Sequence, residues 1–195
     1  IIKVGDTYYW YGEDNKIAYS LRTGVSCYSS KDLKTWTYEG LAFNAFDYER
    51  NGEFTDDFLT DHIIGSQGRI ERPKVIYNEK TGKYVMWMHL EKDGVYTLSM
   101  AGVAVSDSPT GPFEWKWYGF PVLDPYVTYN GKMIQTYRDM NLFVDDDGEA
   151  YVIYASEGNQ VTYAVRLNDE YTWIDTEGLN TADPDEIEYN DLGWY

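Results

Sequence analysis

The sequence predicts an all-β protein, and three observations support this fold class. Aromatic residues, which favour strands, make up 17% of the 195 residues, with 20 Tyr, 7 Trp and 7 Phe. A unit of alternating runs separated by Gly turns occurs three times along the chain. No long stretch shows the apolar period of an amphipathic helix. The length suits one domain with a sizeable core, or part of a larger one.

Each unit begins with a predicted β-hairpin, formed by an apolar run, a Gly turn and a second aromatic-rich run. Asp-Gly and Thr-Gly between alternating runs are strong hairpin signals. We expect strands at 1–4 and Thr7–Glu13, at 73–77 and 83–89, and at 140–144 and 149–156. A third strand follows each hairpin, at 25–30, 101–107 and 161–167, and the first two units continue into a fourth strand.

This repeat favours a β-propeller over a β-sandwich, because a sandwich does not need the same hairpin and strand order three times. The turn residues Gly5, Gly82 and Gly148 lie 77 and 66 residues apart, as in blades with variable insertions. We expect a partial first blade at 1–40, a second at 69–116 and a third at 136–176, with rim loops at 41–68 and 117–135 and the start of a linker at 177–195.

Composition excludes several functional classes. A net charge of −17 argues against a nucleic-acid partner, because no basic patch could outweigh this field. No apolar run approaches the ~20 residues of a membrane helix, so we expect no membrane partner. Cys27 is the only cysteine, so no intrachain disulfide can form. His62 and His89 are the only histidines, which makes a histidine-based metal site implausible, and we expect no cofactor.

Propeller topology brings the start of each first strand and the end of each second strand to one opening. The chemistry-bearing residues at these positions are Glu13, Glu71, Arg72, His89, Arg138, Asp139 and Glu157. Glu71 and Asp139 occupy similar places in successive units, each next to an arginine. A carboxylate beside a guanidinium keeps a low pKa, which suits hydrogen bonding to sugar hydroxyls better than proton donation.

Each of these residues also has a plainer interpretation. A charged strand end is often only a solvated ion pair, and His89 is more often a buried structural imidazole than a catalyst. The run Asp145-Asp146-Asp147-Gly148 is similar to part of a calcium loop. It lacks the spaced ligands and the distal Glu, so a hairpin turn is the better interpretation.

Several segments resemble glycoside hydrolase family 43, whose members are five-bladed propellers, and most of all its exo-β-1,3-galactanase branch. The matching segments are Thr7–Glu13 (TYYWYGE), 24–31 (GVSCYSSK), 71–78 (ERPKVIYN), 84–89 (YVMWMH), 102–113 (GVAVSDSPTGPF) and 138–148 (RDMNLFVDDDG). The chain would then hold about three of the five blades.

The resemblance implies exo-acting, inverting hydrolysis of terminal O-glycosidic bonds in plant polysaccharide, with β-1,3-galactan as the expected substrate. It implies that Asp139 tunes the acid and orients the sugar, and that Glu71 binds substrate or sets a pKa. It further implies that Glu13, Arg72, His89, Arg138 and Glu157 contact substrate. The partner would be an oligo- or polysaccharide, and the full-length protein would be secreted or periplasmic and could carry a carbohydrate-binding module.

The sequence also departs from the pattern of the family. The family's general acid is a Glu opening the fourth blade, and its usual base is an Asp opening the first. We expect both to lie outside this chain, which looks truncated at both ends. The alternatives are an arabinofuranosidase or xylosidase on the same scaffold, and a non-catalytic carbohydrate-binding propeller.

Overall fold

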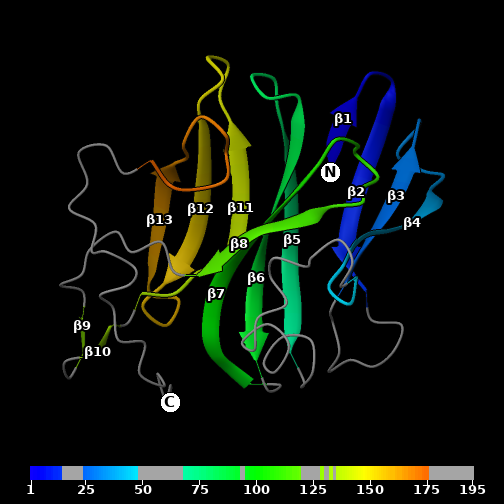
Figure 1. The fold of residues 1–195 in the computed structure, drawn as a ribbon. Helices are drawn as coiled ribbons and strands as arrows, with labels where there is room; N and C mark the ends of the chain where they lie inside the picture. Colours follow the sequence, from blue (N-terminus) through cyan, green and yellow to red (C-terminus); the bar gives the residue numbers. More distant parts are fainter. Residues whose placement is uncertain are drawn as a thin grey trace.

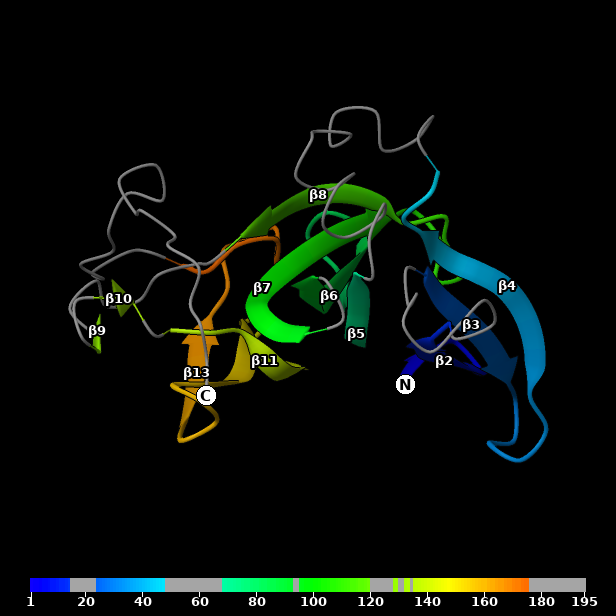
Figure 2. The same cartoon turned by 90° about the horizontal axis from the view of Figure 1, so that it is seen from below.

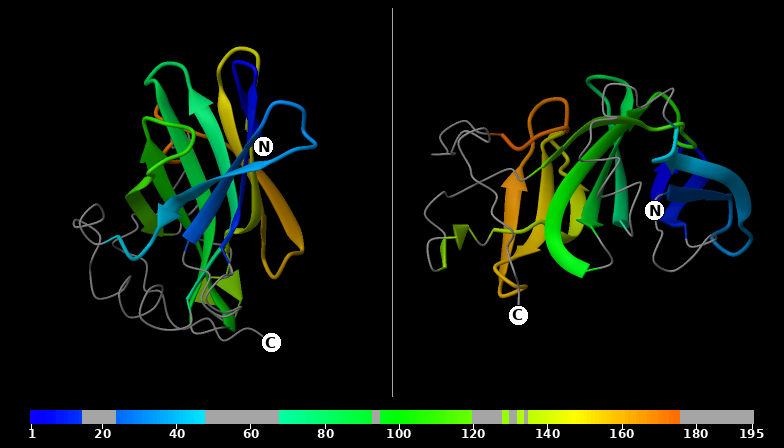
Figure 3. Two further views of the ribbon diagram at one scale, coloured as in Figure 1. Left: turned by 90° about the vertical axis from the view of Figure 1, so that its right-hand side faces the viewer. Right: turned by 60° about the horizontal axis from the view of Figure 1, so that its bottom comes forward.

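The computed structural model describes residues 1–14, 24–47, 68–92, 95–119, 128–129, 132–133 and 135–175. Within these residues all regular structure is β-strand, which agrees with the predicted fold class. Three antiparallel sheets stand side by side like the blades of a fan (Figure 1). Seen from below they follow one another around an arc (Figure 2), and the two further views in Figure 3 show the same order.

The first sheet contains β1 (Ile2–Val4), β2 (Thr7–Glu13), β3 (Gly24–Ser30) and β4 (Thr37–Asn44), in chain order. Its first hairpin pairs Val4 with Thr7 across a turn in which Gly5 has a φ of 60°. A side chain at such a φ would be strained, so the turn favours glycine. β4 continues past residue 40 because Ala42 and Phe43 are buried, with Phe43 opposite Val25 of β3.

The second sheet contains β5 (Arg69–Asn78), β6 (Lys83–Lys92), β7 (Val95–Ser106) and β8 (Glu114–Gly119), again in chain order. β6 is one of the two interior strands, and its apolar side chains are buried on both faces. Tyr84, Met86 and Met88 pack toward the first sheet, whereas Val85 and Trp87 pack toward the third. This two-sided burial explains why β6 reads as a nearly continuous apolar run.

The third sheet contains β11 (Arg138–Val144), β12 (Ala150–Ser156) and β13 (Val161–Arg166). The chain then folds back, and an isolated bridge pairs Leu167 with Ile174. All three predicted hairpins are therefore present, with the expected turns.

The prediction of loops at 41–68 and 117–135 was partly wrong. Within 41–68 and 117–135 the structure has the ends of β4 and β8, and also the short strands β9 (Thr128–Tyr129) and β10 (Lys132–Met133). The reason is that strand pairing continues beyond the polar punctuation, as in the pairs of β8 with β7 up to Gly119. The predicted linker segment 177–195 lies outside the described residues.

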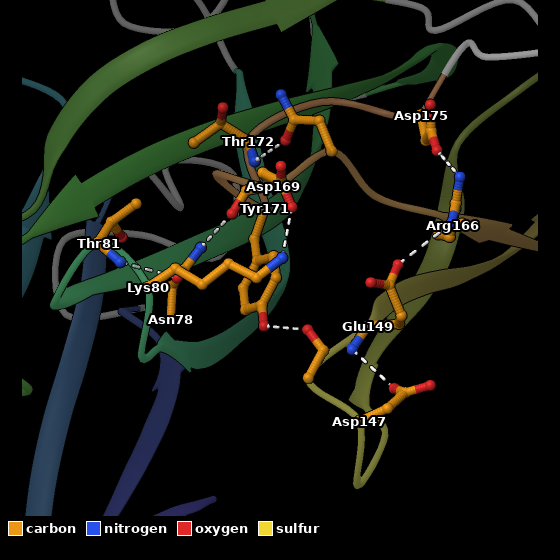
Figure 4. A network of polar contacts seen from close by, with 12 residues as sticks. Asn78, Lys80, Thr81, Asp147, Glu149, Arg166, Asp169, Tyr171, Thr172 and Asp175 are labelled. Atoms are coloured by element: carbon orange, nitrogen blue, oxygen red, sulfur yellow. Dashed lines mark hydrogen bonds and ion pairs between the residues drawn. The ribbon is translucent and has the colours of Figure 1, made fainter.

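A network of polar contacts ties the second sheet to the segment after β13 (Figure 4). The Asn78 side-chain amide donates to the Asp169 carbonyl at 2.8 Å, and the Lys80 ammonium lies 2.5 Å from the Asp169 carboxylate. The Tyr171 hydroxyl donates to the Gly148 carbonyl at 2.6 Å. These contacts lie at the hairpin-turn ends of β5 and β11, so they hold two neighbouring sheets in register at one rim.

Candidate active site

The first strands of the second and third sheets, β5 and β11, begin with the same irregularity. The register of β5 against β6 shifts between Glu71 and Lys74, and that of β11 against β12 shifts between Arg138 and Asn141. Bulges of this kind re-aim side chains at strand ends. They place the two strand starts at one rim, opposite to the hairpin turns.

This register corrects the expected equivalence of Glu71 with Asp139. Arg72 and Asp139 are the two residues with positive φ, 52° and 49°, at the same point of each bulge. Asp139 therefore corresponds to Arg72, and Glu71 corresponds to Arg138. The expected equivalence depended on an arginine next to each carboxylate, but the arginine follows Glu71 and precedes Asp139.

The exposed part of the site is an ion pair between the two sheets. Arg72 Nε lies 2.9 Å from Asp139 Oδ1, and both side chains are about half exposed. The backbone N–H of Arg72 donates to Glu13 Oε1 at 3.1 Å, which brings in the end of β2. Glu13, Arg72 and Asp139 thus join all three sheets at one point, with carboxylate oxygens accessible to a ligand.

The buried part of the site is a chain of polar groups. Glu71 is 6% exposed and pairs in register with His89, whose Nδ1 lies 4.0 Å from Glu71 Oε2. His89 Nε2 lies 2.8 Å from Glu91 Oε1. Ser99 Oγ donates to the same oxygen at 2.8 Å and accepts from Arg138 Nε at 2.7 Å.

Together these contacts form a closed circuit, which we call the rim ring. It consists of Glu71, Arg72, Asp139, Arg138, Ser99, Glu91 and His89, linked by five side-chain contacts and by the two peptide bonds between neighbouring residues. Six of the seven residues singled out from the sequence either belong to the rim ring or, as for Glu13, contact it. The opposition of Glu71 and His89 agrees with the expected meeting of first-strand starts and second-strand ends.

Glu157 is the predicted site residue that stands apart from the rim ring. It follows β12 with a φ of 48°, and its Oε1 accepts a long hydrogen bond of 3.4 Å from the Tyr163 hydroxyl. Its Oε2 is buried without a hydrogen-bond partner. Burial raises the pKa of the Glu157 carboxyl, although hydrogen bonds from Ser156 and Tyr163 act in the opposite direction.

Sequence reasoning missed Glu91 and Ser99. Glu91 could have been found, because it lies two residues after His89 and side chains two apart share one face of a strand. The expected end of that strand at residue 89 hid this relation. Ser99 carried no signal, since its role depends on Arg138 from another sheet.

An aromatic cavity lies on the face of the first sheet that turns away from the second. Its volume is about 560 Å³, and it is lined by Trp10, Gly12, Glu13, Asp14, Ser26, Tyr28 and Trp36. The Trp10 ring lies 5.6 Å from the Tyr28 ring and 5.7 Å from the Trp36 ring. Glu13 therefore connects an aromatic surface with the rim ring.

Two further findings concern only the residues that the structure describes. No group of three or more His, Cys, Asp or Glu side chains among them could hold a metal ion. In the same part of the chain, no helix has the length and apolar character needed to cross a membrane.

Comparison with known proteins identifies the family of the chain. The profile of the family described as "Glycosyl hydrolases family 43" matches residues 1–192. Among curated proteins, none matches. Solved structures do match: an exo-β-1,3-galactanase from Clostridium thermocellum is 38% identical with a TM-score of 0.73, covering 89% of this chain and 34% of that one.

Two further structures are similar. An exo-β-1,3-galactanase from Phanerochaete chrysosporium with galactose is 34% identical, with a TM-score of 0.71, over 89% of this chain and 35% of that one. A family 43 β-1,3-galactosidase with galactodeoxynojirimycin is 34% identical, with a TM-score of 0.72, over 89% of this chain and 58% of that one. The chain thus spans between about a third and three fifths of these proteins.

The comparisons and the topology agree on the architecture. The three sheets are blades of a five-bladed β-propeller, as the resemblance implied. The match extends over both bulges and all three hairpins. The chain belongs to glycosyl hydrolase family 43.

Proposed function

We propose that the full-length protein carrying this chain releases terminal galactose from β-1,3-linked galactan. The supporting observation is the identity of 34–38% to exo-β-1,3-galactanases and a β-1,3-galactosidase over 89% of the chain. The family match over residues 1–192 includes the rim ring. An α-L-arabinofuranosidase from Clostridium thermocellum is only 23% identical and supports the fold alone. Galactose is therefore favoured over arabinose as the sugar removed.

The exposed carboxylates of the rim are suited to holding sugar hydroxyls. Arg72 fixes the Asp139 carboxylate through Oδ1 and leaves it half exposed. A carboxylate held in this way can accept hydrogen bonds from a sugar at little further cost in entropy. We assign to Asp139 the orientation of the terminal sugar, and to Glu13 a second hydroxyl contact.

Inverting hydrolysis requires one acid that protonates the leaving oxygen and one base that activates water, about 6.5–9.5 Å apart. In our proposal Glu71 and Asp139 are neither of these groups. They shape the electrostatic field around the acid and bind the sugar, and residues other than these two supply the acid and the base.

Burial changes the roles assigned to two other residues. His89 is 2% exposed, which argues against the direct sugar contact expected from the resemblance. Arg138 donates to the buried Ser99 hydroxyl. We therefore assign His89 and Arg138 to support of the carboxylates, and we keep Arg72 and Glu157 as residues at the edge of the sugar site.

The test is a time course of β-1,3-galactotriose hydrolysis by the full-length protein, followed by chromatography and by NMR of the anomeric protons. We expect galactose and β-1,3-galactobiose as first products, with galactose released first in the inverted α form. Binding of the trisaccharide without release of galactose would indicate a carbohydrate-binding propeller. Release of arabinose or xylose from the corresponding aryl glycosides, without release of galactose, would indicate another specificity.

The expected location also follows from the substrate. A polysaccharide is too large to enter a cell intact, so an enzyme that degrades it acts outside the cytoplasm. We therefore propose secretion or export to the periplasm. A carbohydrate-binding module elsewhere in the full-length protein would fit the same substrate.

A further inference from the structure

The rim ring contains ionisable side chains that are buried and so do not contact a sugar directly. Glu91 and Ser99 are fully buried, and His89 and Glu71 are nearly so. Burying such groups is costly unless each is paired, so a chain of this kind needs a reason. The direction of its hydrogen bonds supplies one.

The proton positions in this chain follow from the chemistry of each group. Arg138 Nε is only a donor, so Ser99 Oγ must accept from it and must give its own proton to Glu91. An ionised carboxylate is only an acceptor, so His89 Nε2 must carry a proton to bond with Glu91 Oε1. Although burial alone raises the pKa of Glu91, hydrogen bonds from His89 and Ser99 outweigh it and lower that pKa overall.

These hydrogen bonds fix the orientation of the His89 imidazole and therefore which ring nitrogen is directed at Glu71. Because Nε2–H is held by Glu91, Nδ1 is the nitrogen presented to Glu71, 4.0 Å from Oε2. Among the residues that the structure describes, the charged groups near the imidazole include Glu71 on β5, Glu91 on β6, Arg69 opposite Glu91 in the β5–β6 register, and Arg138 of β11 through Ser99. A change of charge at His89 Nδ1 therefore acts first on Glu71.

We propose that His89 is a positioning residue that orients the Glu71 carboxyl group, and that the contacts of Glu91 with Ser99 and of Ser99 with Arg138 fix the His89 ring for this purpose. These contacts also connect the third blade to the second. Arg138 donates to the Ser99 hydroxyl, and the Tyr137 N–H donates to the Ser99 carbonyl at 2.8 Å. One set of contacts thus fixes the position of Glu71 relative to Asp139. This inference deepens the proposed function and rests on it for its kinetic test.

Two substitutions of His89 distinguish its positioning of Glu71 from a purely structural contact with Glu91. His89→Gln can keep a donor at the Nε2 position toward Glu91 but has nothing at the Nδ1 position. His89→Asn places its amide near the Nδ1 position and loses the contact with Glu91. Each variant therefore retains a polar group at the position of only one of the two imidazole nitrogens.

The kinetic experiment measures kcat and KM for β-1,3-galactobiose against pH in the full-length protein. We expect His89→Gln to unfold near the wild-type temperature yet to lose about 10- to 100-fold in kcat, with a displaced pH profile. His89→Asn should unfold at a lower temperature and retain more of the wild-type pH profile when assayed cold. A His89→Gln variant with kcat within twofold of wild type and an unchanged profile would overturn the proposal.

A second experiment needs no activity. In the full-length protein, the imidazole signal of His89 in long-range ¹H–¹⁵N NMR is assigned by its loss in the His89→Gln variant. We expect a proton on Nε2, and a change in the Nδ1 shift on Glu71→Gln but not on the distant control Asp107→Asn. A neutral ring protonated on Nδ1, or a Nδ1 shift unaffected by Glu71→Gln, would overturn the proposal.

The two experiments distinguish the failure of each claim. If the NMR result is as expected but no galactose is released from any substrate, the proposed function fails and the positioning role of His89 stands. If galactose is released but Nδ1 does not respond to Glu71, the positioning role fails and the proposed function stands. Should Glu71→Gln not fold, the tautomer measured in the otherwise wild-type protein still decides the first point.

Discussion

Arg72 and Asp139 adopt the left-handed backbone conformation that L-residues rarely occupy, with φ values of 52° and 49°. Such a conformation costs about 1–2 kcal/mol per residue. Both residues lie at strand bulges, and their side chains meet at 2.9 Å in a half-exposed ion pair worth at most about 1 kcal/mol. The pair does not offset the strain, which is typical of a site kept for binding rather than for stability.

Glu157 gives a pH-dependent prediction at the same scale. Burial raises the pKa of the folded-state Glu157 carboxyl above its ordinary value of 4.5, so the folded state binds a proton more tightly than the unfolded chain. This contribution to stability is present below pH 4.5 and is lost as pH rises through the folded pKa. We expect Glu157→Gln to raise the unfolding temperature relative to wild type increasingly from pH 4 to pH 7.

Calorimetry of both proteins across this range checks the prediction. All other titrating groups are shared, so their contributions cancel in the difference. A difference in unfolding temperature that stays constant with pH would show that burial does not perturb Glu157.

At the scale of single elements, the loop between β7 and β8 is fitted tightly against the first sheet. The Phe113 N–H donates to the Ala42 carbonyl at 2.7 Å, and the Tyr11 hydroxyl donates to the Pro109 carbonyl at 2.6 Å. Gly111 lies in this loop with a φ of 85°, and an added Cβ would come within 2.3 Å of the Ala42 carbonyl oxygen.

Gly111→Ala should therefore destabilise the protein by about 2 kcal/mol or more, since a strained φ and a backbone clash act together. Gly5→Ala is the matched control, because Gly5 also has positive φ but nothing lies within 4 Å of its Cβ position. We expect the control to cost about 1 kcal/mol. Urea denaturation that gives equal losses for the two variants would contradict the role assigned to this loop.

The strands and hairpins could be predicted from the sequence because their signals are local. Gly5, Gly82 and Gly148 mark turns, and the alternation on either side sets the pairing. Strand ends at residues 44 and 119 were missed because pairing with the neighbouring strand, rather than local composition, decides where they stop.

The site could be predicted only in part, for a related reason. The residues at the rim were found from topology, but their partners come from other sheets. Arg72 pairs with Asp139, not with its neighbour Glu71, and Arg138 reaches Ser99. Glu71 was misaligned with Asp139 because the order of carboxylate and arginine is reversed between the two strands.

At the scale of the whole molecule, the blades are joined at both rims. The polar contacts of Figure 4 and two tryptophans connect the second blade to residues 168–175. Trp87 is fully buried and donates from Nε1 to the Tyr171 carbonyl at 2.8 Å, while Trp117 Nε1 donates to the Thr172 carbonyl. The rim ring fastens the opposite end.

Trp87→Phe tests this arrangement. The smaller ring leaves a cavity and an unpaired carbonyl, so we expect a loss of about 2–4 kcal/mol in the free energy of unfolding. Trp10→Phe, at a tryptophan that is 47% exposed, should cost less than about 1 kcal/mol. Similar losses in denaturant titrations of the two variants would argue against a joint at Trp87.

The central claim is that the rim ring of the second and third blades holds the sugar that the enzyme cleaves. The most direct measurement compares kcat/KM for β-1,3-galactobiose in the full-length protein and in its Asp139→Asn and Asp107→Asn variants. Asp107 is a matched control, since it also forms an ion pair, with Lys83 at 2.6 Å, but lies 84% exposed away from the rim ring. We predict that Asp139→Asn lowers kcat/KM by about 100-fold or more with little change in unfolding temperature, while Asp107→Asn stays within twofold of wild type. Equal activity of the two variants would contradict the account.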